Sequence, residues 1–204
     1  TSIIGGFGGG PEGAALVSVA DASTALLVYY VGGAGYVMVS SILQNPPINT
    51  ARQTIWVRNV SLQALARNTN LICGGGGLTS GGPGTEHQLW EIAALGLHTS
   101  VAGGHIVHGA RKAKLVKPNQ GTGMEPRWEG ETARASAGLS RMDVNELIKF
   151  ILTKYESKIA PEVAPEGFSF EELYEYDEVR VKPHYLELYL KVKNELAQKG
   201  LKFD

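Results

Sequence analysis

The chain has 204 residues, of which 43% are hydrophobic and 19% are charged, and its formal net charge is −1 at pH 7. This length allows one sizeable hydrophobic core, and the balanced charge gives no electrostatic reason to expect nucleic acid or an anionic membrane surface as a partner. Cys73 is the only cysteine, so no internal disulfide can form and a reducing cytoplasm is the expected location.

Charge and glycine are distributed unevenly along the chain. Residues 1–110 contain 7 of the 39 charged residues and 20 of the 26 glycines. A self-sufficient domain normally has many charged residues on its surface, so most sides of this region are expected to be in contact with other protein rather than with water. The start at Thr1, without a methionine, fits the same expectation. We therefore expect a homo-oligomer, or packing against a missing part of a larger body.

The first half alternates short apolar runs with helical patterns. Strands are predicted at 1–4, 36–43, 70–73 and 105–109, and helices at 13–31, 49–67 and 84–102. The helix at 13–31 is apolar on nearly all sides, so it is predicted to be buried rather than to span a membrane. Asn49 or Thr50 is expected to cap the second helix and Thr85 the third. This order predicts parallel strands in an α/β fold, with about 35 residues per repeat.

The character of the sequence changes after residue 120. Helices are predicted at 125–140, 141–160, 170–176 and 183–200, with a linker at 160–167. Asp143 is expected to cap the second of these helices, and Gly200 to end the last. Residues 121–204 are therefore expected to form a helical region that packs on residues 1–120.

The stretch GGFGGGPEG at 5–13 contains Gly8, Gly10 and Gly13 in the G-x-G-x-x-G spacing of dinucleotide-binding loops. That motif also needs an acidic residue at the end of the second strand, where this chain has Gln44. The spacing alone is common in glycine-rich loops, so nucleotide binding through residues 5–13 is kept only as an alternative.

Other candidate residues follow the predicted strands. The second glycine run, 74–86, lacks the Gly-Lys-Ser/Thr of a nucleoside triphosphate loop, but both runs are expected between a strand and a helix, on the functional face of a parallel fold.

His105 and His108 are three apart on a strand, point to opposite faces and are not expected to share a metal ion; one of them is expected to face the site. Cys73 is expected at a strand end. An N-terminal nucleophile at Thr1 is disfavoured, since those hydrolases have antiparallel sheets.

The segment GTGMEPRWEGETARASAGL at 121–139 closely resembles the C-terminal signature of the monomethylamine:corrinoid methyltransferases. The segments IIGGFGGGPEG at 3–13 and GGPGTE at 81–86, and the closing YLELYLKVKNELAQKGLKF, resemble segments of the same family in the same order. The resemblance spans the whole chain, with divergence over 30–75 and an insertion around 74–80.

This resemblance implies a (βα)8 barrel of TIM type. Residues 1–120 would supply its last four βα units as a half-barrel, and residues 121–204 the C-terminal helices. In the family, a methylamine binds at the carboxyl mouth of the barrel, and its methyl group passes to the cobalt of a separate corrinoid protein. A pyrrolysine orients the amine; this residue and an acidic residue near it lie upstream of the segment that matches Thr1.

The candidate residues that face the substrate or the corrinoid come from the resemblance and from the positions of residues on the predicted strands and loops. The family has Gln-x-Tyr where this chain has Thr69 to Ile72, and Asn70 is the candidate to replace the glutamine. The candidate residues are Gly5, Gly6, Gly8, Asn70, Cys73 and His108, with no metal site and no cofactor held tightly by the chain. Glycine-rich loops suit the approach of a wide, flat corrin ring. Two further possibilities are a different methylated amine as substrate, and an inactive relative that keeps the fold and the partner surface.

Overall fold

The structure, a computed structural model, describes residues 1–6, 8–33 and 35–203. The first part of the chain alternates strands and helices. Its elements are β1 (Ser2–Ile4), α1 (Pro11–Gly32), β2 (Val37–Met38), β3 (Ser41–Leu43), α2 (Arg52–Asn68), β4 (Cys73–Thr79), α3 (Glu86–Val101) and β5 (Ile106–Lys112). All pairings among these strands are parallel, which confirms the predicted α/β class.

The second part is mostly helical. It comprises α4 (Met124–Ala135), α5 (Arg141–Tyr155), a 3-10 turn (Glu156–Lys158), α6 (Phe170–Leu173), β6 (Tyr174–Glu175), β7 (Arg180–Val181) and α7 (Pro183–Gln198). The predicted helix at 170–176 was wrong beyond Leu173, because Tyr174 and Glu175 pair with Val181 and Arg180 in an antiparallel hairpin. This pairing gives the backbone of the two residues hydrogen-bond partners that a further helical turn would otherwise supply.

The predicted strand at 36–43 is split between two sheets. Its first part, β2, pairs with β4, whereas its second part, β3, pairs with β1. The chain changes partner at Val39 and Ser40, which belong to neither strand. Four successive parallel segments therefore lie in the order β1, β3/β2, β4, β5. The part of β4 beyond Gly74 does not pair with β3, which leaves a gap between the two strands.

The prediction that glycines 74–77 end the third strand was also wrong. These residues form most of β4, between β2 and β5. Two neighbouring strands satisfy the backbone groups of β4, which outweighs the low intrinsic strand propensity of glycine. A Cβ atom on Gly77 would overlap Cδ1 of Leu95, so the missing side chain lets α3 pack closely against the sheet.

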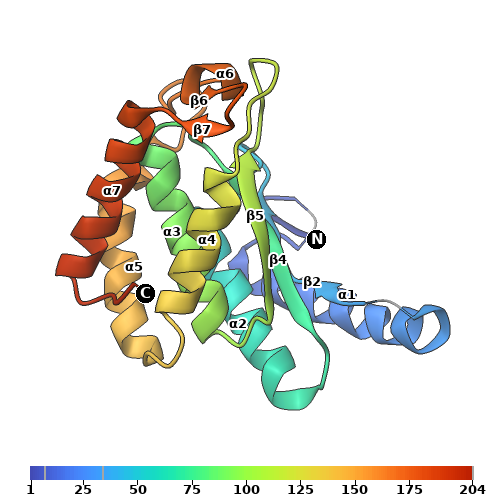
Figure 1. Cartoon of the computed structure of the whole chain (residues 1–204). Coiled ribbons are helices and arrows are strands. Elements are labelled where there is room, and N and C mark those ends of the chain that lie inside the picture. Colours follow the sequence, from blue (N-terminus) through green and yellow to red (C-terminus); the bar gives the residue numbers. More distant parts are fainter. Residues whose placement is uncertain (7, 34, 204) are drawn as a thin grey trace.

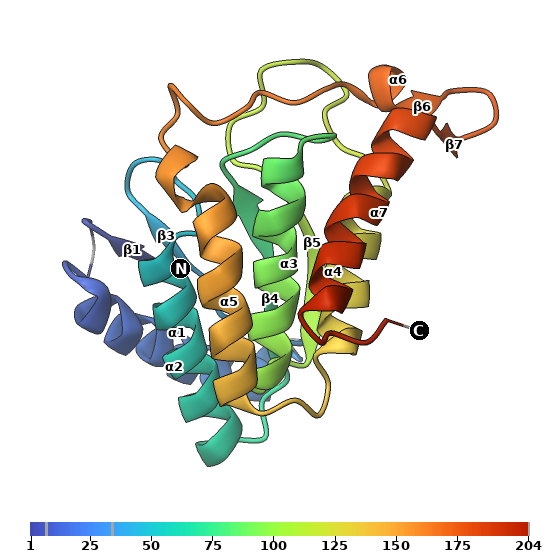
Figure 2. The ribbon, with the colours of Figure 1, turned by 90° about the vertical axis from the view of Figure 1, so that its left-hand side faces the viewer.

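The helices α2 to α5 and α7 lie on one side of β4 and β5 (Figures 1 and 2). The main hydrophobic core is formed between α3, α4, α5 and α7, and residues 87–99 of α3 are all buried. Val37 and Val39 pack with α2 residues in a second, smaller cluster. Strand side chains alternate between faces, so Tyr36 and Met38 point to the opposite face, where both are exposed.

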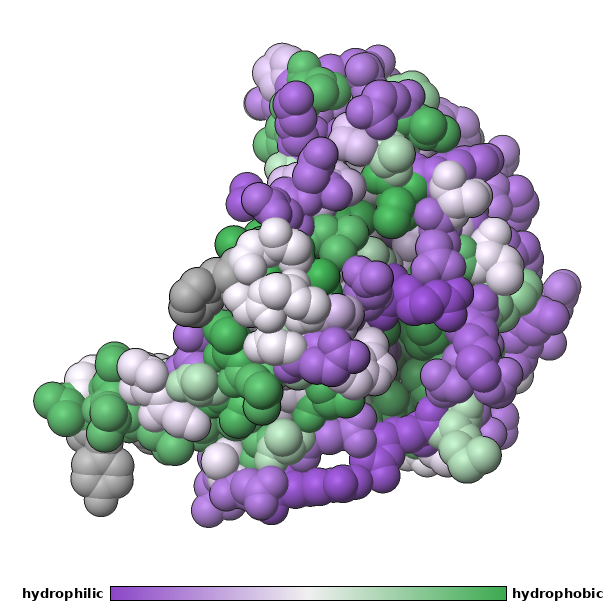
Figure 3. Space-filling model, turned by 180° about the vertical axis from the view of Figure 1, so that it is seen from behind, coloured by the Kyte–Doolittle hydropathy of each residue, from purple (hydrophilic) through white to green (hydrophobic). Residues whose placement is uncertain are grey.

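The prediction that 13–31 forms a buried helix was only half right. Residues 11–32 form α1, but among its described side chains the buried ones, Ala14, Ser18 and Ala22, make a stripe of small residues only one side chain wide. Large apolar side chains such as Leu16, Leu27 and Val31 point outward, and the far end of the helix projects from the molecule with a mainly hydrophobic surface (Figure 3). Among the described residues, α1 is the one helix whose length and composition satisfy the criteria for a membrane span.

The residues that cap the helices agree in part with those predicted from the sequence. Thr85 caps α3 by accepting a hydrogen bond from the N–H of Gln88 (3.2 Å), and Gly200 follows α7 with a φ of 96°. The N-cap of α2 is Ala51, without a side-chain cap, because Asn49 and Thr50 are hydrogen-bonded elsewhere. Ser140, rather than Asp143, caps α5.

Candidate functional site

The predicted residues Gly5, Gly6 and Gly8 follow the carboxyl end of β1. The loop closes on itself, since the N–H of Gly5 donates to the carbonyl of Gly9 (2.8 Å) and the N–H of Gly9 to that of Gly6 (3.0 Å). A Cβ atom on Gly5 would lie 3.4 Å from Oε1 of Gln44, the residue that follows β3. The glycine loop and Gln44 therefore share the carboxyl edge of the sheet, where parallel α/β folds bind ligands.

The geometry of this loop does not favour dinucleotide binding. A pyrophosphate site needs free backbone N–H groups at the start of the following helix. Here α1 begins at Pro11, which has no N–H. The N–H groups of Gly5 and Gly9 are bonded within the loop, and that of Gly6 donates to the carbonyl of Ile3. The close contact between Gly13 and the carbonyl of Gly8 explains the glycine at position 13 without a ligand.

Asn70 and Cys73 lie at the opposite, amino end of β4. Asn70 is exposed before the strand begins, whereas Cys73 is buried, and this burial raises the pKa of its thiol. The N–H of Cys73 donates to Nδ1 of His105 (3.2 Å), which gives His105 a structural role. The structure therefore separates Asn70 and Cys73 from the glycine loop rather than bringing them together.

His108 is exposed on the uncovered face of the sheet, in the middle of β5. Its ring lies beside that of Tyr36, with 6.0 Å between the ring centroids. A Cβ atom on Gly76 would lie 2.7 Å from Nδ1 of His108 and 2.5 Å from the carbonyl oxygen of Gly109. The glycine in β4 thus leaves the space that the imidazole ring occupies.

Asn49, which the sequence suggested only as a cap, closes the gap between β3 and β4. Its backbone N–H donates to the carbonyl of Leu78 (3.1 Å), and its Oδ1 accepts from the N–H of Leu78 (2.8 Å). Its Nδ2 donates to the carbonyl of Gly76 (3.2 Å) at the bulge in β4. Asn49 therefore takes the place of a strand residue where the sheet is split.

Two charged side chains are buried between the helices and the sheet. Arg58 of α2 donates to the carbonyls of Gly75 (2.8 Å) and Gly76 (3.1 Å), and burial lowers its pKa to about 10. Burial raises the pKa of Glu129 on α4 to about 7, opposed by the charge of Arg58. Within the described residues, neither carboxylate oxygen of Glu129 has a hydrogen-bond partner.

Ser80, His87 and Glu91 contain the side chains of a nucleophile–base–acid triad without its geometry. Nε2 of His87 lies 2.8 Å from Oγ of Ser80 and also 3.5 Å from the Glu91 carboxylate. A triad acid holds the other ring nitrogen, and its nucleophile must be accessible. All three side chains are buried, so this cluster is structural.

The linker between α5 and α6 lies across the carboxyl edge as a strap, residues 160–169 (Figure 2). The N–H of Gly82 donates to the carbonyl of Pro165, and the N–H of Phe168 to that of Pro83, both at 2.9 Å. A Cβ atom on Gly82 would overlap the carbonyl oxygen of Glu166. The part of the second glycine run that follows β4 therefore packs against the backbone of the strap and is not an open phosphate loop.

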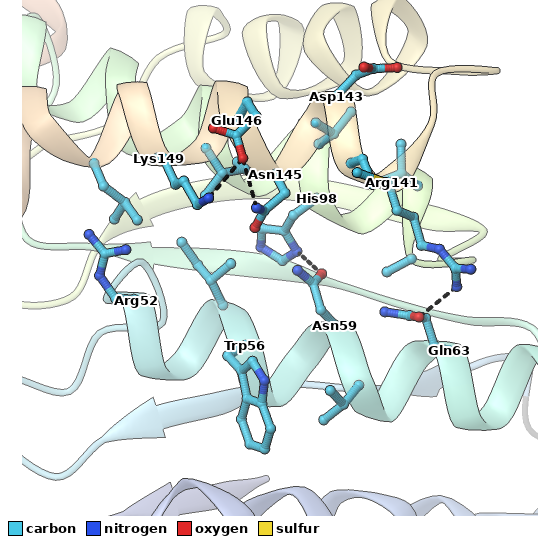
Figure 4. A pocket seen from close by; sticks show the side chains of 18 residues that line it. Arg52, Trp56, Asn59, Gln63, His98, Arg141, Asp143, Asn145, Glu146 and Lys149 are labelled. Atoms are coloured by element: carbon cyan, nitrogen blue, oxygen red, sulfur yellow. Dashed lines mark hydrogen bonds and ion pairs between the residues drawn. The ribbon is translucent and has the colours of Figure 1, made fainter.

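A groove of about 620 Å³ lies between α2 and α5 (Figure 4). His98 lies at its floor, with Nδ1 3.0 Å from Oδ1 of Asn59, and Arg141 donates to Gln63 across one end (2.6 Å). The groove is in the helical layer and contains none of the predicted site residues. Within the described part of the chain, no group of three His, Cys, Asp or Glu residues is placed to bind a metal ion.

Comparison with known proteins identifies the family. Residues 1–201 match the family model described as monomethylamine methyltransferase MtmB. The chain belongs to this family. It is 29% identical over 201 residues to MtmB2 of Methanosarcina acetivorans and 29% identical over 205 residues to MtmB1 of Methanosarcina barkeri. Each comparison covers 98% of this chain and 43% of the relative, so the chain spans less than half the length of these proteins.

The fold agrees with that assignment. The crystal structure of the Methanosarcina barkeri monomethylamine methyltransferase superposes with a TM-score of 0.87 and 27% sequence identity, covering all of this chain and 43% of that one. A hydroxylamine complex of MtmB gives the same values. The family resemblance seen in residues 121–139 is thereby confirmed.

Proposed function

We propose that this chain is the C-terminal part of a methyltransferase that moves a methyl group from a small methylated amine to a separate corrinoid protein. The observation that carries the proposal is the family match over residues 1–201, together with a sheet whose carboxyl edge is lined by a glycine loop. The alternative of an inactive relative makes the same structural predictions and differs only in turnover.

We further propose that residues 1–120 are half of a TIM-type barrel on which residues 121–204 pack. Four successive parallel segments with helices on one face support this architecture. In a closed barrel, the uncovered face with Tyr36, Met38 and His108 would be the interior. A further four strands would then pair with β1 and β5, which are the outermost of the four successive parallel segments.

The residues at the carboxyl edge fit the approach of a large flat ring. Apart from position 7, which lies outside the described residues, residues 5–10 are all glycine, and a Cβ atom on Gly9 would meet nothing within 4 Å. A bound corrinoid would supply a strongly nucleophilic Co(I). This chain would supply a surface of bare backbone for the ring, with Gln44 beside it as a polar group for the amine.

The remaining parts of the proposal concern partners and location. The exposed apolar side of α1 supports assembly with a second copy or with the rest of a longer protein. We propose a cytoplasmic location, with no nucleic-acid or membrane partner and no tightly held cofactor. Asn70, far from the carboxyl edge, is not proposed to contact the amine.

The deciding experiment mixes the intact protein, of which this chain is proposed to be the C-terminal part, with a corrinoid protein in the Co(I) state and adds monomethylamine, dimethylamine or trimethylamine. Conversion of the Co(I) spectrum to that of methylcobalt with one of these amines supports the proposal. No conversion, with retained binding of the corrinoid protein, supports the inactive relative. Micromolar binding of NAD or FAD, without binding of the corrinoid protein, contradicts both.

A further inference from the structure

The loop between β4 and α3, residues 80–85, is fixed by one buried carboxylate. Oε1 of Glu91 accepts hydrogen bonds from Oγ1 of Thr50 (2.5 Å), from the backbone N–H of Ser80 (2.8 Å) and from the Ser80 hydroxyl (2.9 Å). Oε2 accepts from the backbone N–H of Gly81 (2.9 Å). A carboxylate has about four acceptor positions, and the loop and Thr50 supply four donors, three to Oε1 and one to Oε2.

The partners of Glu91 are held in turn from two other elements. The Tyr155 hydroxyl on α5 donates to the carbonyl of Thr50 (2.6 Å). Nζ of Lys112 at the end of β5 donates to the carbonyls of Ser80 and Pro165, both at 3.0 Å. Glu91 is therefore the centre of a network that joins the ends of β4 and β5, α5 and the strap.

The ionised form of Glu91 suits these contacts, because every neighbour can donate. Burial raises its pKa to about 7 against the effect of the four hydrogen bonds. The titratable groups around it are His87 on its own helix, Lys112 on β5 and Tyr155 on α5. Burial lowers the pKa of His87 to about 4 and also lowers the pKa of Lys112.

The loop needs such a restraint because of its composition. It contains glycines at positions 81, 82 and 84, and glycine has the greatest backbone freedom of any residue. A loop that becomes ordered only when a partner docks weakens the affinity for that partner, whereas a loop already ordered does not. The loop lies at the carboxyl edge, on the side where the corrinoid protein is proposed to approach. Its residues 80–84 are buried beneath the strap, which has exposed residues at this edge.

We propose that Glu91 is a positioning residue: its carboxylate holds residues 80–85 in one course, and these residues hold the strap that covers them, so that the carboxyl edge offers the corrinoid protein a rim of constant shape. This inference rests on the proposed function for its partner. Its structural part, the fixed loop, stands on the contacts of Glu91 alone.

The test replaces Glu91 with glutamine, which keeps the size of the side chain but turns an amide N–H₂ toward donors on one side. Backbone amides of residues 80–85 are then expected to exchange hydrogen about tenfold faster, while the rest of α3 keeps its protection. The KM for the corrinoid protein is expected to rise about tenfold, with kcat changed less than about twofold. Glu187→Gln, on the exposed side of α7, is the control for loss of one charge and should change neither quantity.

A second variant guards against a failure of E91Q to fold. Thr50→Val removes one donor and leaves Glu91 with its backbone partners, so a smaller rise in exchange, about threefold, is expected. Unchanged exchange in both variants overturns the positioning role. Faster exchange with an unchanged KM overturns the docking role, as does a loss confined to kcat.

A wild type that transfers no methyl group and binds no corrinoid protein contradicts the proposed function itself. Hydrogen exchange then still decides whether Glu91 fixes the loop.

Discussion

The helices α1 and α3 have the same kind of sequence and opposite surroundings. Each carries only two acidic residues and no lysine or arginine, and each is otherwise dominated by apolar and small side chains. Yet α3 is buried continuously over residues 87–99, whereas the described side chains that α1 buries form only a stripe of small residues against α2 and the strands. An apolar helix requires cover, but its own sequence does not say whether this cover lies in the same chain.

The difference lies in what surrounds each helix. The sheet, α4, α5 and α7 pack around α3, so its large side chains meet others from the same chain (Figure 2). The outer side of α1 has no such neighbours among the described residues, and its far end projects from the molecule (Figure 1). We therefore expect equal changes in these two helices to have very different effects.

The largest expected difference is between Leu95→Ala on α3 and Leu27→Ala on α1. Leu95 is 0% exposed against β4, whereas Leu27 is 70% exposed. The first change should lower the free energy of unfolding by about 2–5 kcal/mol through lost burial and a cavity. The second should lower it by less than about 0.5 kcal/mol. Urea unfolding followed by circular dichroism compares them, and equal losses would mean that α1 is as well covered in solution as α3.

The second prediction concerns a charge buried beside α3. Folding raises the pKa of Glu129 from 4.5 to about 7, so the native carboxyl keeps a proton that the unfolded chain has lost in this range. The stability of the wild type should therefore fall, relative to Glu129→Gln, as the pH rises from about 4.5 to 7. The gap should grow by about 3 kcal/mol, at about 1.4 kcal/mol per pH unit. Taking the difference removes the opposing titration of His87, and a gap independent of pH would contradict the prediction.

The third prediction tests the close packing of the sheet around His108. Gly76→Ala places a methyl group against the backbone carbonyl of Gly109 and should destabilise the fold by about 1–3 kcal/mol. Gly35→Ala, near the end of α1, meets nothing within 4 Å and is the matched control, with an expected change below about 0.5 kcal/mol. Thermal unfolding measures both, and similar melting temperatures would show that the backbone at Gly109 and the ring of His108 both move aside.

The smallest effect on stability is expected where the effect on assembly is largest. Leu27→Glu with Val31→Glu places two charges on the exposed side of α1, where the free energy of unfolding of the single chain should change by less than about 0.5 kcal/mol. The mass in solution by light scattering should fall, because the charges oppose burial of this surface. A wild type that is already a stable monomer would contradict the expected association through α1.

Much of the fold follows from patterns within short segments. The parallel α/β order follows from apolar runs alternating with helical periodicity, and the cap at Thr85 follows from a residue type at a helix start. The errors fall where distant residues decide. Gly77 belongs to a strand because β2 and β5 flank it, and Asn49 is not a cap because the split between β3 and β4 takes its amide.

The candidate site likewise contains residues whose place follows from the sequence and residues whose place only distant contacts decide. Gly5, Gly6 and Gly8 follow a strand in the sequence, and their place at the carboxyl edge follows from that alone. Cys73 was expected at a strand end, but β4 starts at this residue instead of stopping there, which moves it to the other edge. Glu91 gave no signal beyond a carboxylate within an apolar helix, a residue type that is almost never buried without partners.

By itself, the sequence determined the class of the fold, the family and the residues that form most helices, because these depend on local periodicity and on motifs of neighbouring residues. Only the tertiary structure decided that α3 is enclosed and α1 is not, that the glycines of β4 are strand, and that Glu91 joins the ends of β4 and β5, α5 and the strap. These features depend on contacts between residues far apart in the chain, whose strength is set by burial and by hydrogen-bond partners that no single segment contains.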